Sequence, residues 1–250
     1  MAKKKIDFWY WAKGNNFGDM LNLPVLKYMS EGKMQFNYVS KYSHGKLLAV
    51  GSILRKLNIN DIVWGAGVIK KEYINVPAGV KILAVRGPLT KKMLKIQYKI
   101  PYGDPGLLMP EIYTPVKLDK EYDVGIIPHY VDDQLMQIKN DNNILMINVR
   151  DNYKEIINKI NSCNLIISSS LHGVLVSEAY RKPVIWVKSP SGKIIGHSFK
   201  FNDYFLSTNR ERRKPVEWNN LSKIVNDKNI LPFGSIDLKP LKKAWSEYFG

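Results

Sequence analysis

One stretch constrains the fold more than any other, namely residues 164–183 with the sequence NLIISSSLHGVLVSEAYRKP. Residues 165–167 form a short apolar run typical of a buried strand, and residues 171–180 carry apolar side chains at helical spacing. A strand is therefore predicted to end, and a helix to begin, within about four residues. In parallel sheets ligands bind at the carboxyl ends of strands, and the first N–H groups of a helix favour an anion. The stretch thus predicts an α/β fold with an anion pocket at this junction.

The junction combines small hydroxyl side chains, a titratable ring and a glycine, which are Ser168, Ser169, Ser170, His172 and Gly173. The hydroxyls and backbone N–H groups suit an anion, and an imidazole exchanges protons near neutral pH. His172 is therefore an acid–base candidate, and the three serines with Gly173 are binding candidates. In an alternative interpretation the serines only cap the helix and His172 packs beside them. The local sequence leaves both interpretations open.

The rest of the chain alternates between predicted strands and predicted helices. Apolar runs next to glycine or turn residues predict strands at residues 6–11, 47–51, 61–65, 80–86, 123–127, 143–149 and 183–187. Helical signals predict helices at residues 20–29, 88–96, 153–163 and 238–249, whereas residues 189–205 have little periodicity and are predicted to form a long loop. Such alternation implies parallel sheets with right-handed crossovers.

The predicted architecture is two Rossmann-like domains with a cleft between them. The chain has 250 residues, more than one core usually serves, and residues 111–120 are rich in charge, with prolines at positions 110 and 115, as in a linker. We expect an N-terminal domain over residues 1–112 and a C-terminal domain over residues 113–235. Residues 236–250 are expected to form a helix that packs back on the body of the protein.

Arg86 stands at the carboxyl end of the predicted strand 80–86 and begins the sequence RGPLT. A guanidinium at the carboxyl end of a strand can hold a phosphate or carboxylate through two parallel hydrogen bonds. Arg86 is therefore a candidate for binding an anionic substrate in the cleft. An ion pair at the surface or between the domains is the alternative.

Other polar residues stand in predicted turns next to these strands. Asn16 and Asp19 belong to the sequence GNNFGD, where Asp19 suits the start of a helix by capping and by charge. Asp104 lies in the turn sequence YGDPG and could hold a hydroxyl or an arginine. His129 follows a strand of the second series. All four are candidates for lining the cleft, although plain structural turns would need the same residue types.

The composition places the chain among ordinary globular proteins of a reducing compartment. It is 45% hydrophobic and 24% charged, and its one cysteine, Cys163, excludes a disulfide framework. No apolar run approaches the roughly 20 residues of a membrane span, and the lysine-rich start lacks the cleavage region of a signal peptide. We expect a cytoplasmic protein, with the inner face of the membrane as an alternative location.

The charge balance favours anionic partners without choosing among them. Lys and Arg number 38 against 22 Asp and Glu, a formal net charge of +16. The basic residues are scattered, and no zinc spacing, RNP-type strand or basic heptad region occurs, so no nucleic acid is expected. The sequence has no GxGxxG fingerprint and no P-loop, so neither a dinucleotide nor ATP is indicated, and no metal or other cofactor is expected.

Seven motifs, in this order and spacing, resemble the polysaccharide pyruvyl transferase family, in particular its exopolysaccharide-modifying branch. They are NNFGD, WGAGV, VRGPLT, YGDPGLL, IPHY, SSSLHG and KFNDY, and they cover about residues 7–204. The resemblance implies two Rossmann-like domains facing each other as in glycosyltransferases of the B architecture. It also implies transfer of the pyruvyl group of phosphoenolpyruvate onto two hydroxyls of a sugar, which gives a ketal.

The resemblance assigns roles to two residues and implies two substrates. His172 occupies the family's SxLHG position and is the implied general acid, and Arg86 would clamp the phosphate or carboxylate of phosphoenolpyruvate. The acceptor would be a saccharide, free or lipid-linked, and contact with a membrane surface stays open. Two alternatives remain, a glycosyltransferase that uses a nucleotide sugar and a non-catalytic protein that binds glycans or membranes.

Overall fold

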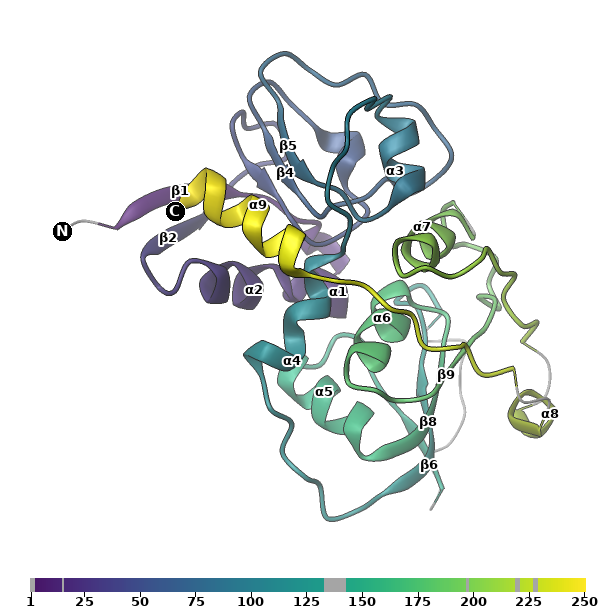
Figure 1. Ribbon diagram of the computed structural model, residues 1–250. Helices are drawn as coiled ribbons and strands as arrows, with labels where there is room; N and C mark the ends of the chain where they lie inside the picture. The colour runs from purple at the N-terminus through teal and green to yellow at the C-terminus, as the bar shows by residue number, and fades with distance from the viewer. Residues whose placement is uncertain (1–2, 15, 133–142, 197, 219–220, 227–228) are drawn as a thin grey trace.

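The computed structural model describes the whole chain except residues 1–2, 15, 133–142, 197, 219–220 and 227–228, and it is an α/β protein with two separate sheets (Figure 1). The first sheet has the order β2-β1-β3-β4-β5, and the second has the order β7-β6-β8-β9. All of these strand pairs are parallel. The predicted fold class, with two parallel sheets joined by helices, is therefore correct.

The first sheet uses residues 4–84. Its strands are β1 (Lys4–Phe8), β2 (Met34–Tyr38), β3 (Leu47–Leu48), β4 (Ile62–Trp64) and β5 (Lys81–Ala84). Helices α1 (Phe17–Met20) and α2 (Asn22–Met29) connect β1 to β2. Helices α3 (Pro88–Met93) and α4 (Met109–Ile112) follow β5. Short 3-10 helices occur at Ala12–Gly14, Leu54–Lys56 and Pro105–Leu108. Pro88 occupies the first turn of α3, where its missing N–H costs no hydrogen bond.

The second sheet and its helices contain the strand–turn–helix stretch of residues 164–183. Its strands are β6 (Tyr122–Ile127), β7 (Ile144–Met146), β8 (Cys163–Ser168) and β9 (Val184–Trp186). The helices of this half are α5 (Tyr153–Asn161), α6 (Leu171–Ala179), α7 (Phe199–Ser207) and α8 (Leu221–Asn226), and α9 (Lys239–Phe249) ends the chain. Strand β8 ends at Ser168 and α6 begins at Leu171, as the sequence predicts.

The two halves share buried contacts. One hydrophobic core contains side chains that belong to both sheets, and Leu21 and Leu175 approach the same glycine, Gly106. Helix α9 crosses back to the first sheet, where the Trp64 indole donates a hydrogen bond of 2.9 Å to the carbonyl of Leu241 and stacks edge-on against Trp245 (Figure 1). The last helix therefore ties the end of the chain to the first half.

Three sequence predictions were wrong in detail. Strand β2 was missed, and the predicted helix over residues 20–29 is two helices, α1 and α2. The predicted long loop over residues 189–205 contains most of α7. Six successive side chains of α7, residues 200–205, are buried, so the helix lacks the polar face that produces a recognisable helical period.

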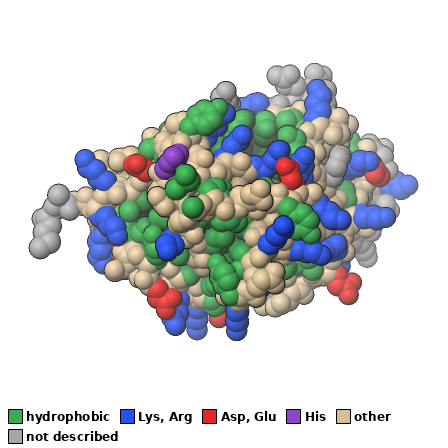
Figure 2. Space-filling view, turned by 90° about the horizontal axis from the view of Figure 1, so that it is seen from above, with side chains coloured by type: hydrophobic (Ala, Val, Ile, Leu, Met, Phe, Trp, Pro, Cys, Tyr) green, Lys and Arg blue, Asp and Glu red, His purple; other side chains and the backbone are tan. Residues whose placement is uncertain are grey.

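Within the part of the chain that the structure describes, no helix is both long enough and apolar enough to span a membrane. On the face seen in Figure 2, Lys and Arg side chains are interspersed with apolar and uncharged ones. The excess positive charge is thus distributed over this face and does not form one continuous patch.

Candidate active site

A cavity of about 420 Å³ lies between the carboxyl ends of the two sheets. The first half contributes residues that follow β1 and β3, among them Trp9, Asp19 and Ser52. The second half contributes residues that follow β6 and β8, among them His129 and His172. The carboxyl edge of parallel sheets is where ligands bind in α/β proteins, and the volume falls in the range of small-molecule sites.

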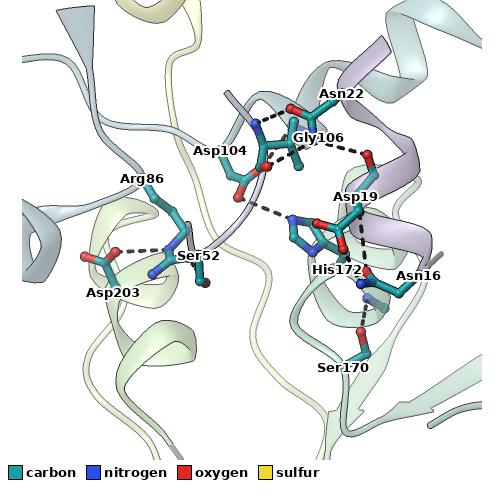
Figure 3. Close-up of polar contacts among 12 residues, drawn as sticks. Asn16, Asp19, Asn22, Ser52, Arg86, Asp104, Gly106, Ser170, His172 and Asp203 are labelled. Atoms are coloured by element: carbon teal, nitrogen blue, oxygen red, sulfur yellow. Dashed lines mark hydrogen bonds and ion pairs between the residues drawn. The ribbon is translucent and has the colours of Figure 1, made fainter. Parts of the chain in front are cut away.

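His172 stands in the first turn of α6, with Ser170 as the N-cap. Its ring packs directly against Gly18, since a Cβ on that glycine would lie 2.0 Å from His172 Nδ1. On the other side of the ring, Nε2 lies 3.5 Å from Oδ2 of Asp104, whose side chain is fully buried (Figure 3). The glycine of the NNFGD motif therefore makes room for the histidine of the SSSLHG motif.

Asp19 lies on the cavity wall and is 6% exposed. Its carboxylate accepts a hydrogen bond from the Asn16 amide, and the Asn16 carbonyl oxygen accepts from the Asp19 N–H at 3.3 Å (Figure 3). Burial raises the pKa of Asp19 to about 7, although His172, Asn16 and Lys200 each lower it. Asp19 can therefore take up or release a proton near neutral pH.

Lys200, in the first turn of α7, is the cation that the sequence analysis missed. Its side chain lines the cavity and is 7% exposed, and among the described residues its ammonium has no hydrogen-bond or ion-pair partner. Burial, followed by the nearby charge of Arg86, lowers the pKa of Lys200 to about 8. A buried ammonium of this kind is suited to an anion that enters the cavity.

His129 also lines the cavity, as predicted, and stacks on Tyr130 with ring centroids 4.5 Å apart. Burial, together with the positive charge of Lys200, lowers the pKa of His129 to about 3. The ring is neutral at physiological pH, and it can accept or donate a hydrogen bond but does not carry a charge there.

The serine turn divides into two structural residues and one cavity residue. Ser168 donates a 2.9 Å hydrogen bond to the Ile127 carbonyl, and Ser169 accepts one of 2.9 Å from the His129 N–H. Both serines are buried outside the cavity lining, while Ser170 caps α6 and also lines the cavity. Gly173 allows α6 to approach the second sheet, because a Cβ there would lie 2.3 Å from the Ser168 hydroxyl. Capping thus accounts for Ser170, whereas Ser168 and Ser169 hydrogen-bond to backbone groups at the end of β6.

Arg86 lies behind the cavity wall and is fully buried. Its Nε donates to Asp203 at 3.0 Å, one terminal nitrogen donates to Ser52 at 2.6 Å, and the other donates to the Val68 carbonyl at 2.8 Å. Gly67 makes room for the guanidinium, since a Cβ there would lie 2.3 Å from its central carbon. Of the two interpretations of Arg86, these contacts match the ion pair, here with a residue of α7 (Figure 3).

Asp104, predicted to hold a hydroxyl or an arginine, makes no hydrogen bond or ion pair with Arg86 in the described part of the chain and lies behind His172 rather than in the cavity lining itself. It caps the 3-10 helix Pro105–Leu108, where Oδ1 accepts the Gly106 N–H at 3.0 Å. Its second oxygen faces His172. Within the described part of the chain, no cluster of His, Cys, Asp and Glu could hold a metal ion.

Comparison with known proteins decides the family. The model of the polysaccharide pyruvyl transferase family matches residues 16–191, most of the chain. This chain belongs to the polysaccharide pyruvyl transferase family. The match includes the cavity residues Asn16, Asp19, His129 and His172, and it confirms the family predicted from the seven motifs.

Two relatives of this pyruvyl transferase family member extend over most of its length. The uncharacterized protein L143 of Acanthamoeba polyphaga mimivirus is 31% identical, over 94% of this chain and 86% of the relative. The succinoglycan biosynthesis protein ExoV of Rhizobium meliloti (strain 1021) is 28% identical, over 83% of this chain and 67% of the relative. No solved structure gives a significant match, so the likeness to the B architecture of glycosyltransferases stays a prediction.

Proposed function

We propose that the protein transfers the pyruvyl group of phosphoenolpyruvate onto two hydroxyls of a saccharide and forms a ketal. Family membership supports pyruvyl transfer onto a polysaccharide, and the relative ExoV is named for succinoglycan biosynthesis. One observation carries the proposal. A single cavity holds a buried ammonium, an imidazole and a carboxyl group whose pKa is about 7, contributed by Lys200, His172 and Asp19.

The donor site is proposed to centre on Lys200. Phosphoenolpyruvate carries a phosphate and a carboxylate, and a buried ammonium that has no hydrogen-bond or ion-pair partner among the described residues gains a charge-assisted pair with either group. Ser170 and the first N–H groups of α6 add hydrogen-bond donors at the same wall. Arg86 supports the donor site without contacting the donor, because its ion pair with Asp203 fixes α7, the helix that carries Lys200.

The chemistry requires one proton donor and one proton acceptor. His172 gives a proton to the methylene carbon of phosphoenolpyruvate, and the electron pair of the C=C bond forms the new C–H bond of a methyl group. The adjacent carbon becomes an oxocarbenium-like centre, and Lys200 holds an anionic group of the donor in place and stabilises the phosphate when it leaves. A sugar hydroxyl attacks this carbon and releases its proton to Asp19.

The ketal closes when phosphate leaves. The C–O bond to phosphate breaks, a second sugar hydroxyl attacks the same carbon, and its proton departs with the phosphate. The proton on Asp19 returns to His172, which restores the starting state. Asp19 suits the acceptor role because a base with a pKa near the working pH is effective, and the neutral His129 can hydrogen-bond a substrate hydroxyl.

Isothermal titration calorimetry of the purified protein tests the donor. We expect phosphoenolpyruvate to bind and a panel of nucleoside diphosphates not to bind. Binding of a nucleoside diphosphate alone would instead support a glycosyltransferase that uses a nucleotide sugar. If neither ligand binds, the non-catalytic glycan-binding alternative gains support, and a glycan array with the same protein then tests it.

A further inference from the structure

A pair of buried polar atoms at the back of the cavity has no partner other than each other among the described residues. Nε2 of His172 and Oδ2 of Asp104 are both inaccessible to solvent, and neither makes a hydrogen bond with a described residue in this structure. They lie 3.5 Å apart. The cost of burying unpaired polar atoms is reduced only if they interact, and a carboxylate oxygen can only accept a hydrogen bond.

We propose that Asp104 is a positioning residue that holds the Nε2–H tautomer of His172, so that Nδ1 is the nitrogen that exchanges a proton with the substrate. The proposal rests on the proposed function, in which His172 is the acid. With Nε2–H directed at Asp104, a neutral ring carries its lone pair on Nδ1. In the imidazolium form it is the Nδ1 proton that moves to the methylene carbon of the donor, and the ring reverts to the neutral Nε2–H tautomer.

The groups around the His172 ring are consistent with a fixed proton on Nε2 and proton exchange at Nδ1. Nδ1 lies against Gly18, and the next residue, Asp19, is on the cavity wall. The titratable groups around His172 are Asp104, Asp19, His129 and Lys200, which belong to four different segments. Of these, only Asp104 faces Nε2 at 3.5 Å, so it alone sets which nitrogen carries the fixed proton.

Asp104→Asn tests the assignment because the geometry predicts how the amide will lie. The Gly106 N–H donates to Oδ1 at 3.0 Å, so an asparagine keeps its oxygen at this position. Its NH2 group then replaces Oδ2 and donates to Nε2. The variant therefore forces the Nδ1–H tautomer while it preserves the shape of the side chain, and carboxylates that orient a catalytic imidazole can be worth orders of magnitude in kcat.

The measurement is ¹⁵N NMR of imidazole-labelled protein, in which the His172→Gln spectrum identifies the His172 signals. We expect the Nε2–H tautomer in the wild type, the Nδ1–H tautomer in Asp104→Asn, and no change in Asp119→Asn, a matched replacement of an exposed carboxylate. In turnover, kcat should fall at least about 100-fold in Asp104→Asn, with phosphoenolpyruvate affinity within about threefold of the wild type.

The inference is overturned if the wild type carries the Nδ1–H tautomer, or if Asp104→Asn leaves the tautomer unchanged. Should Asp104→Asn not fold, the wild-type tautomer alone decides the matter. The tautomer is measured without substrate. Failure of phosphoenolpyruvate to bind the wild type therefore counts against the proposed function and leaves the Asp104–His172 assignment to its own spectrum.

Discussion

Arg86 and Lys200 are two buried cations, of which only Lys200 lines the cavity, and they differ in their partners. Arg86 is fully buried, and three of its nitrogen atoms donate to protein oxygens, including a carboxylate of α7. Lys200, on α7 like Asp203, lines the cavity and has no hydrogen-bond or ion-pair partner among the described residues, and its ammonium lies 5.6 Å from the centroid of the Phe201 ring. The first arrangement suits a structural ion pair, and the second suits a site that an anionic ligand completes.

The two cations should also have opposite effects on the free energy of unfolding. Removing one partner of a buried ion pair leaves the other charge uncompensated and is strongly destabilising. Removing a buried cation that has no partner relieves a desolvation penalty. The same substitution at the two positions should therefore change stability in opposite directions, and this difference provides the first two tests.

Arg86→Met is expected to have the largest effect on stability. Asp203 would keep its hydrogen bonds from the Thr90 N–H and hydroxyl but lose its only ion pair among the described residues. We expect the free energy of unfolding to fall by about 3–5 kcal/mol. Urea denaturation measures this change. Lys33→Met, at a side chain 74% exposed, is the matched control and should shift it by less than about 0.5 kcal/mol. An equally small loss at Arg86 would contradict the structural assignment.

Lys200→Met should stabilise the ligand-free protein at pH 7. The folded-state pKa of Lys200, about 8, lies below its ordinary value of 10.5, so stability is lost as the pH falls through this range and the loss is complete below pH 8. Methionine removes the loss, and we expect a gain of about 2 kcal/mol at pH 7 that disappears above pH 10.5. Urea denaturation at pH 7 and at alkaline pH measures both values. Destabilisation at pH 7 would show that Lys200 has a structural partner.

Asp19→Asn tests the carboxyl group on the same cavity wall. The folded-state pKa of Asp19 is raised from 3.8 to about 7, so the stabilising effect of its protonated form is lost as the pH rises through this interval. The full shift corresponds to about 4 kcal/mol, and we expect about half of it because the environment relaxes. Thermal unfolding at pH 4 and pH 8 should show equal stability of variant and wild type at pH 4 and a more stable variant at pH 8. A constant difference would rule out the raised pKa.

The affinity for phosphoenolpyruvate should depend on pH in the way that a lysine donor site requires. Above pH 8 the ammonium of Lys200 loses its proton, so the affinity should fall by up to tenfold per pH unit, about 1.4 kcal/mol. An arginine side chain in general keeps its charge over this range, so a clamp made by an arginine predicts no such decline. Calorimetry between pH 7 and pH 9.5 distinguishes the two, with Lys188→Met, at an exposed lysine, as the control.

The sequence predicts the general fold well because its strands are short apolar runs next to glycine, and the parallel arrangement follows from their alternation with helices. The elements that it misses have weaker local patterns. Helix α7 is buried on all sides and has no amphipathic period, and the edge strand β2 is half-exposed with polar residues at two of its five positions.

The sequence predicts which residues lie at the cleft but not which groups those residues contact. His172, Asp19, Asn16 and His129 can be placed at one cleft because each follows a parallel strand or begins the next helix. Whether Arg86 binds a ligand or Asp203 depends on a contact across 117 positions in the chain, which local sequence does not encode. Lys200 does belong to the KFNDY motif, and this motif was the signal that could have identified it.

The most direct test of the central claim is a phosphoenolpyruvate titration of the wild type and Lys200→Met by calorimetry at pH 7. A charge-assisted pair in a buried site predicts an affinity at least about 30-fold weaker in the variant, which urea denaturation must show to be folded. An equal affinity in the two proteins would contradict the account, because the anion would then bind without the buried cavity lysine that, among the described residues, has no hydrogen-bond or ion-pair partner.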